Sequence, residues 1–339
     1  MNTKKYVITA ASRYAFELLK GPFIHGTVHS VYRKTVNLSF NGQLLALQTA
    51  GSPLSPISLI TNLTAGEINA LGISPGDPVL VQDCAIVVGG VRAGCGAAPA
   101  FQADFQDMSA STGCGASPAF RADFQDMSAS TGYEAAPAFR FDFSAAFRQD
   151  LKLSTNLSPK MRTYLKEEIL RALSCRDAGS FELLFADRPT DKNHLEEIPF
   201  LMVAQKRFTD TKHFLREGNW SDAATTLRAL IGLGLGLTPG GDDFLCGVLA
   251  GSILAGQTAH PFASCLASQI RKHLADTNDI SAAFLSCALI GQFSLAVNRL
   301  TSLPSSEEML SIFCEIGHSS GTDTLCGVYF ALECAEYFL

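Results

Sequence analysis

Apolar and polar residues alternate along much of the first hundred positions, as they do in strands with one buried face. Phe23–Phe40 alternates in this way, Asn41-Gly42 is a tight-turn signal, and QLLALQTA continues the apolar pattern beyond it. Another strand pair, PVLVQDCAIVVGG, follows the turn at Leu71–Asp77. No crossover helix of βαβ length separates these runs. We therefore expect a β-rich, barrel-like domain over residues 1–93, with a short helix within residues 1–20.

From Pro159 onward the apolar residues recur at spacings of three and four, which is typical of amphipathic helices. Met161–Leu173 is the first such segment, and a short helix is expected at Ser180–Leu184. The fold class is therefore α+β, with an all-helical C-terminal domain over residues 144–339. Capping and stop signals predict its other helices at Phe200–Glu217, Ser221–Ile231, Pro261–Ala275, Ser281–Leu300 and Ser305–Gly317.

Residues 94–143 hold a tandem repeat with a period of 19 residues. Gly94–Thr112 and Gly113–Thr131 are nearly identical, and Gly132–Phe143 is a decayed third copy. Units rich in Ala, Ser and Gly supply little hydrophobic core, so the repeat is interpreted as a flexible insertion that rejoins the β domain at its end. The alternative is a partner-binding loop anchored by its phenylalanines.

Two glycine-rich turns in the helical half share one sequence pattern. Gly240–Val248 reads GGDDFLCGV and Ser320–Val328 reads SGTDTLCGV, which places Asp323 opposite Asp243. Each turn predicts a buried helix with an aspartate in its first turn. If the two helices pack through their glycine faces, both positive dipole ends and both aspartates border one cavity suited to a small anion. The alternative is a pair of capped core helices whose glycines serve packing only.

The candidate chemistry lies around these turns. Asp243, Asp323 and His318 are the candidate catalytic residues, with His318 as a general acid or base. The aspartates are open to three roles, namely Mg²⁺ binding, substrate contact or helix capping, so no cofactor is predicted with certainty. His29 and Ser30 are expected to face the cavity from the β domain. The candidate substrate-binding residues are Thr238, Gly240, Gly241, Asp242, Thr277, Ser281, Ser319, Ser320 and Gly321.

Composition narrows the class of protein. A net charge of −6 without a Lys/Arg cluster argues against nucleic-acid binding. Arg13 and Glu17 break the apolar run near the N-terminus, so neither secretion nor a membrane segment is expected. The ten cysteines are scattered without a C-x-x-C pair, which favours reduced, structural thiols in a cytoplasmic protein. A single catalytic cysteine is the alternative.

Three stretches also carry a resemblance to a known family. Ile231–Gly251, Thr277–Leu285 and Ile316–Val328 resemble the signature stretches of the AllH-like family, named for a subunit of oxamate carbamoyltransferase. Leu235 and Gly240 depart from it, because the family's turn carries Pro and Ser there. The departure puts any role of a serine hydroxyl in doubt and leaves the aspartates in place.

The resemblance implies participation in oxamate carbamoyltransferase, which in allantoin and purine breakdown splits oxalurate with phosphate into oxamate and carbamoyl phosphate. It also implies partner subunits, since the family's activity is attributed to three different subunits, and small anionic substrates. Two alternatives stay open: a non-catalytic scaffold subunit of that complex, and a metal-dependent amide hydrolase.

Overall fold

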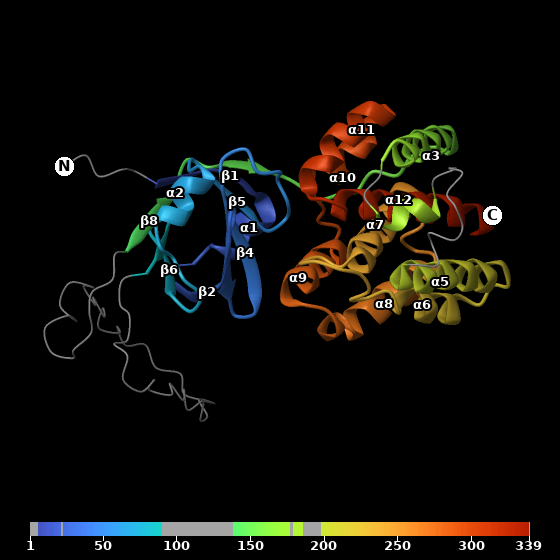
Figure 1. Cartoon of the computed structure of the whole chain (residues 1–339), viewed down its shortest axis with the longest axis horizontal. Coiled ribbons are helices and arrows are strands. Elements are labelled where there is room, and N and C mark those ends of the chain that lie inside the picture. Colours follow the sequence, from blue (N-terminus) through green and yellow to red (C-terminus); the bar gives the residue numbers. More distant parts are fainter. Residues whose placement is uncertain (1–5, 22, 90–137, 177–178, 186–197, 339) are drawn as a thin grey trace, which may run out of the picture.

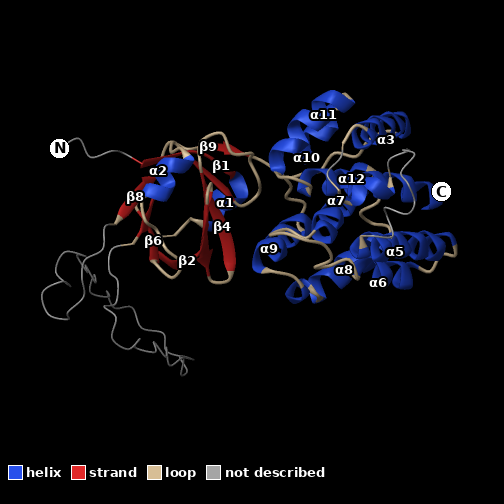
Figure 2. Cartoon of the chain, viewed as in Figure 1, coloured by secondary structure: helices blue, strands red, loops and turns tan. Residues whose placement is uncertain are grey.

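The computed structural model describes the chain except residues 1–5, 22, 90–137, 177–178, 186–197 and 339. Nearly all of the tandem repeat lies outside the described residues, so its expected flexibility stays a prediction. The described chain has two parts, a β-rich part followed by a helical part (Figures 1 and 2). The expected α+β class, with a barrel-like domain before a helical one, is confirmed.

The β-rich part is a sheet that closes on itself. Its strands run in the order β5-β4-β3-β2-β6-β7-β8-β1, and β5 pairs with β1 to close the ring. β9 pairs in parallel with residues 10–12 of β1, whereas β8 pairs with residues 6 and 7 of the same strand. The strands are β1 (Tyr6–Ser12), β2 (Ile24–Tyr32), β3 (Thr35–Phe40), β4 (Gln43–Gln48), β5 (Ser58–Thr61), β6 (Pro78–Gln82), β7 (Ala85–Val88), β8 (Phe139–Asp142) and β9 (Phe147–Gln149).

Local sequence signals predicted some of these strands correctly and failed to predict the limits of others. Asn41 and Gly42 have φ of 51° and 79° and join β3 to β4, as the tight-turn signal predicted. The alternating run Phe23–Phe40 forms two strands, β2 and β3, because a turn at residues 33–34 divides it, and the alternating pattern did not reveal this turn. That turn consists of Arg33 and Lys34, which carry no turn signal.

The expected N-terminal helix is largely replaced by a strand. Tyr6–Ser12 forms β1 because β5 and β8 supply backbone partners on both sides, and this pairing outweighs local helix propensity. Only Arg13–Leu18 is helical (α1), and the Ser12 hydroxyl caps it by accepting from the Ala15 N–H at 2.8 Å. A second short helix of the barrel is α2 (Ala65–Ala70).

The helical part surrounds two central helices, α7 and α12 (Figure 1). Its short 3₁₀ segments are Phe181–Leu184, Leu274–Asp276, Leu300–Ser302, Cys314–Ile316 and Ala335–Phe338. Its α-helices are α3 (Pro159–Ser174), α5 (Pro199–Arg216), α6 (Trp220–Arg228), α7 (Gly240–Leu254), α8 (Pro261–Lys272), α9 (Asp279–Leu289), α10 (Leu295–Arg299), α11 (Ser306–Phe313) and α12 (Ser320–Cys334).

Two helix predictions need correction. The helix expected over Ser221–Ile231 begins at Trp220 with Asn219 as its cap and ends at Arg228. The helix expected over Ser281–Leu300 is two helices, because Gly291 ends α9 with a φ of +80° and the chain then pairs with residues 151–153 before α10.

The central helices pack through their glycines, as the repeated pattern suggested. A Cβ on Gly247 would lie 2.1 Å from the Thr324 carbonyl oxygen, and one on Gly327 would lie 2.0 Å from that of Phe244. Gly251 likewise leaves room for Ala331 on α12. The backbones therefore approach as closely as only glycine allows, and both helix N-termini lie at the same end of the pair.

The two parts meet along α9 and the α9–α10 link. The Leu295 N–H donates to the Leu54 carbonyl at 2.9 Å, and His29 Nε2 lies 3.0 Å from Asp279 Oδ2. Cys287 of α9 is buried in the core of the barrel. The predicted domain boundaries at residues 93 and 143 remain a proposal. Among the described residues, no helix has both the length and the apolar character needed to cross a membrane.

Candidate functional site

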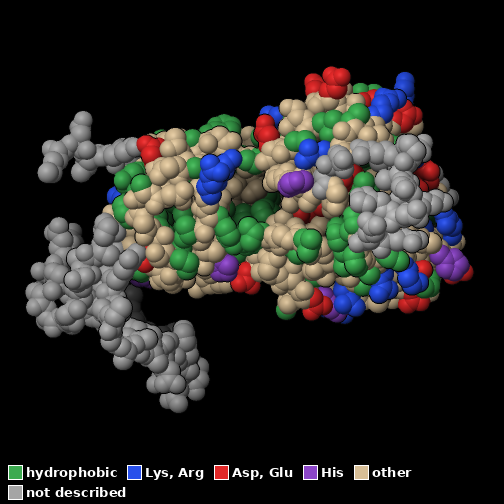
Figure 3. Space-filling model, viewed as in Figure 1, with side chains coloured by type: hydrophobic (Ala, Val, Ile, Leu, Met, Phe, Trp, Pro, Cys, Tyr) green, Lys and Arg blue, Asp and Glu red, His purple; other side chains and the backbone are tan. Residues whose placement is uncertain are grey.

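A cleft between the barrel and the helical part holds two adjoining cavities of about 160 and 490 Å³. Hydrophobic side chains gather around the hollow where the two parts meet (Figure 3). Both cavities are lined by barrel residues and by residues of the helical part. They share Gln48, Ser55, Thr238, Phe284, Ile316 and Ser320.

Both glycine-rich turns border the larger cavity. Residues 235–238 precede α7 and residues 317–320 lead into α12, and both segments line it. The Thr238 and Ser320 hydroxyls join the two turns, with their oxygens 2.7 Å apart. The cleft therefore faces the N-terminal ends of both central helices, where the helix dipoles are positive.

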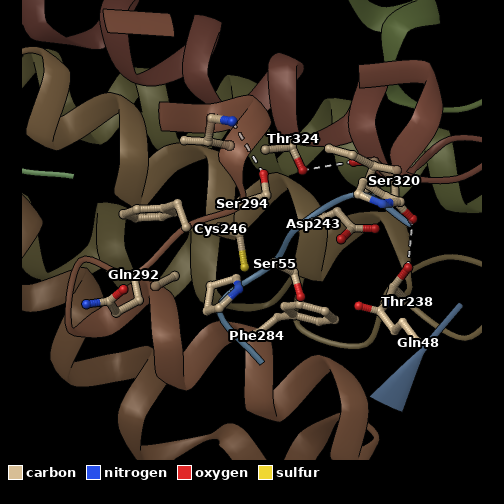
Figure 4. Close-up of a pocket in the computed structure, with 16 residues that line it drawn as sticks. Gln48, Ser55, Thr238, Asp243, Cys246, Phe284, Gln292, Ser294, Ser320 and Thr324 are labelled. Carbon is tan, nitrogen blue, oxygen red and sulfur yellow. Dashed lines mark hydrogen bonds between the residues drawn. The ribbon is translucent and has the colours of Figure 1, made fainter. Parts of the chain in front are cut away.

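Asp243 is the acidic residue that lines the smaller cavity (Figure 4). Its Oδ2 atom is buried and has no hydrogen-bond partner among the described residues. Burial raises the pKa of Asp243 well above its usual value, and the negative charge of Asp323 adds to this, while the Ser320 and Thr238 hydroxyls lower it. Burial and the Asp323 charge therefore favour the protonated carboxyl form of Asp243, which can donate a proton.

Asp323 does not line either cavity. Its carboxylate is fully buried and accepts hydrogen bonds from the Ser180 hydroxyl at 2.9 Å and the Phe181 N–H at 3.1 Å. Burial raises the pKa of Asp323 to about 7, even though these two hydrogen bonds favour the ionised form. The two aspartates of the repeated pattern are therefore neighbours that face different surroundings.

Asp242 lines neither cavity and is held by hydrogen bonds from other parts of the chain. Its Oδ1 accepts from the Gly232 N–H at 2.9 Å, and its Oδ2 accepts from the Thr277 hydroxyl at 2.6 Å. Ser281 is 1% exposed and lines neither cavity. Burial raises the pKa of Asp242, and the hydrogen bond from Thr277 opposes this rise. These contacts tie α7 to the start of α9, and a direct contact with substrate stays a prediction for these residues.

Three glycines predicted to bind substrate lie at close backbone approaches. A Cβ on Gly241 would lie 2.0 Å from the Leu230 carbonyl oxygen, and one on Gly321 would lie 2.1 Å from that of Phe313. A Cβ on Gly240 would lie 2.9 Å from Asp323 Oδ2. Packing alone is sufficient to require glycine here, and none of the three lines a cavity.

His318 and Ser319 line the larger cavity. The His318 side chain is exposed, and its carbonyl oxygen accepts from the Arg176 guanidinium at 2.7 Å. Of the two barrel residues expected to face the cavity, His29 bonds to Asp279 instead, and Ser30 accepts from the Asn37 amide at 3.0 Å. Neither of them is among the residues that line the cleft.

The donors around the turns do not form a metal site in the part of the chain that the structure describes. No group of three or more His, Cys, Asp or Glu side chains there is arranged to hold an ion. Asp242 and Asp323 both accept hydrogen bonds from protein donors, and of the three aspartates only Asp243 has a buried oxygen, Oδ2, without a partner among the described residues. The aspartates at the two turns therefore do not together fit a Mg²⁺ ion.

Sequence reasoning missed the polar residues that face the cavity from outside the turns. Gln48 ends strand β4, Ser55 lies in the loop after it, and Gln292 lies in the link between α9 and α10. Gln48 accepts from the Ser58 hydroxyl at 2.5 Å, while Gln292 has a buried Oε1 atom without a partner among the described residues. Glutamine has no characteristic spacing, so no sequence signal could have identified these positions.

Cys246 lines the smaller cavity, so its reactivity tests whether the cysteines are structural thiols, as the sequence suggested. Burial, together with the charges of Asp243 and Asp242, raises the pKa of the Cys246 thiol well above its usual range. Because the thiolate is the reactive form, we expect iodoacetamide to label Cys246 far more slowly than the exposed Cys84 and Cys314. Mass spectrometry of peptides from briefly labelled native protein measures this. Fast labelling of Cys246 with loss of activity would instead identify a catalytic thiol.

The fold and the cleft define a two-part α+β protein in which a closed sheet and a helical domain enclose two cavities beside two helix N-termini. Residues 230–332 match the family model described as oxamate carbamoyltransferase subunit AllH, and residues 6–106 match the AllH family N-terminal domain. The two matches cover most of the chain, which belongs to the AllH family. No curated protein and no solved structure matches it.

Proposed function

We propose that this chain is a subunit of oxamate carbamoyltransferase and that its cleft binds the substrates of oxalurate cleavage. The observation that carries the proposal is the buried Oδ2 of Asp243, which has no hydrogen-bond partner in the described part of the chain. Asp243 lines a cavity beside two helix N-termini in a chain of this family. Cytoplasmic location, partner subunits and a place in allantoin breakdown belong to the same proposal.

Asp243 has the properties that this reaction needs in a general acid. A phosphate oxygen forms a bond to the carbamoyl carbon of oxalurate, and the bond from that carbon to the oxamate nitrogen breaks. The leaving nitrogen must gain a proton, or it would depart as an amide anion. A carboxyl group whose pKa is raised by burial keeps its proton to a higher pH than an exposed one and can supply it to the leaving nitrogen.

The anionic parts of the substrates suit the larger cavity. The N-terminus of α12 opens onto it through Ser319 and Ser320, and His318 lines the same wall. Backbone N–H groups and the helix dipole favour phosphate and carboxylate at such an end. Burial favours the neutral form of Asp243, and in that form the side chain does not repel an anion bound beside it.

A non-catalytic scaffold subunit is the second candidate. It is favoured by the close packing of Gly240, Gly241 and Gly321, which accounts for these glycines without a ligand. The two candidates differ in what they require of Asp243, since a scaffold has no use for a proton at that position.

The test is an assay of phosphate-dependent oxalurate cleavage by the purified chain, alone and together with its candidate partner subunits. Asp243→Asn should lower kcat by about 10²- to 10⁴-fold, because an amide cannot donate a proton as an acid does, and oxamate affinity should change by only a few-fold. The matched control is Asp83→Asn, an exposed aspartate in the β6–β7 turn whose φ of 47° asparagine also accepts. Full activity of Asp243→Asn in the assembled enzyme would favour the scaffold.

A further inference from the structure

The smaller cavity contains a second unpaired polar atom, at some distance from Asp243. Gln292 lines this cavity, and its Oε1 atom is buried without a hydrogen-bond partner among the described residues. A buried carbonyl oxygen that accepts no hydrogen bond has lost its water without compensation. A ligand with an N–H or O–H group would compensate for this loss.

The backbone holds Gln292 firmly in place. Its own N–H donates to the Cys287 carbonyl at 2.9 Å. On either side, the Leu153 N–H donates to Gly291 at 2.8 Å, and the Phe293 N–H donates to Leu151 at 3.1 Å. These bonds fix the link between α9 and α10 against the chain that leads out of the barrel. The fold therefore fixes the backbone position from which the Gln292 side chain extends.

The surroundings of Gln292 restrict the kind of group that fits. Ala288, Phe293 and Val297 supply apolar walls, and Cys246 adds a protonated thiol. Over the described part of the chain, neither Lys nor Arg lines this cavity. A charged group would lose its hydration there without gaining a counter-ion, whereas an uncharged group with N–H donors could bond to Gln292. The volume of about 160 Å³ exceeds that of a single water site.

We propose that Gln292 forms a subsite for the uncharged carbamoyl group, with its Oε1 accepting from the terminal NH₂ of the ligand. This assignment rests on the proposed function and extends it, because it states which end of the substrate enters the smaller cavity. Asp243 and Gln292 lie at opposite ends of the cavity with Cys246 between them (Figure 4). The carbamoyl NH₂ then points to Gln292, the scissile nitrogen lies toward Asp243, and the anionic end extends into the larger cavity.

Gln292 would therefore distinguish an NH₂ group from a methyl group. A methyl group has the same size but leaves Oε1 unpaired, so it gains nothing from this residue. Phosphonoacetamide and 2-oxopropylphosphonate form a suitable stable pair, because they differ only by NH₂ against CH₃ on the carbonyl carbon. The wild-type chain should bind the amide about tenfold more tightly than the ketone.

Calorimetric titration of the full chain with both compounds tests the subsite. Gln292→Met keeps the length of the side chain but removes the strong acceptor, so the tenfold preference should fall to about one. Gln292→Glu keeps an acceptor and should keep the preference. Gln205→Met, on the exposed face of α5, is the matched control and should behave as wild type. Melting curves of all variants establish that they are folded.

The outcomes separate the subsite from the function on which it rests. Binding of neither compound by the wild-type chain would contradict the proposed function together with the subsite. Equal binding of both by the wild type, or an unchanged preference in Gln292→Met, would overturn the subsite alone. Loss of the preference in Gln292→Met and its retention in Gln292→Glu would support it.

Discussion

Gly327→Ala is expected to destabilise the folded chain by about 3 kcal/mol or more. The added Cβ would lie 2.0 Å from the Phe244 carbonyl oxygen and 2.9 Å from the Cα of Gly247. Both neighbours belong to the backbone of α7, so no side chain can rotate away to make room. The helices would have to separate, and the core around Leu245 and Val248 would lose its close packing.

The control for this substitution is Gly66→Ala in α2. A Cβ there meets nothing within 4 Å, and alanine is the better helix former. This variant should be more stable than wild type by about 0.5–1 kcal/mol, largely because alanine reduces the freedom of the unfolded chain. Urea unfolding of the three proteins measures both effects. A Gly327→Ala protein within 1 kcal/mol of wild type would show that Gly327 is not required for the packing of the two helices.

The second large effect concerns pH. We expect the stability of the chain to decrease as the pH rises from about 4 to about 7, because the pKa of Asp323 is about 7 in the folded protein and about 4 in an unfolded chain. Below this window both states hold the proton. Within it only the folded state still holds the proton, so each rise in pH favours unfolding. A shift of this size amounts to a few kcal/mol at most.

Asp242 and Asp243 act in the same direction, since burial raises the pKa of each. Asp323→Asn should flatten the dependence, because asparagine remains uncharged and can still accept from the Phe181 N–H. Urea unfolding at intervals between pH 4.5 and 8, for wild type, Asp323→Asn and the exposed-site control Asp83→Asn, measures the slope. Stability that increases over this range in the wild type, or a slope unchanged in Asp323→Asn, would contradict the assignment.

Much of the fold could be predicted because its signals are local. Asn41 and Gly42 adopt positive φ with little strain, and for this reason the pair correctly predicted the β3–β4 hairpin. Ser305 and Glu308 satisfy each other's backbone groups, which is why they marked the start of α11. Where a local signal was weak or absent, as at the Arg33-Lys34 turn, the alternating pattern did not reveal the turn.

The closure of the barrel could not be predicted in this way. Residues 6–12 became a strand because β5 and β8, which lie far along the chain, supply its hydrogen-bond partners. Similarly, the break between α9 and α10 comes from pairing with residues 151–153. The free energy of such contacts depends on segments that only the folded chain brings together.

By itself, the sequence determined that two helices begin with glycine and aspartate and that they can pack closely, because spacing along a helix decides which residues share a face. It also carried the resemblance to the AllH family. Only the tertiary structure decided what each aspartate faces. Asp323 meets Ser180, 143 positions away, while Asp243 meets a cavity closed by barrel residues such as Gln48. The reason is physical: the pKa and the partners of a buried carboxyl group are set by whatever packs around it, and those atoms come from distant parts of the chain.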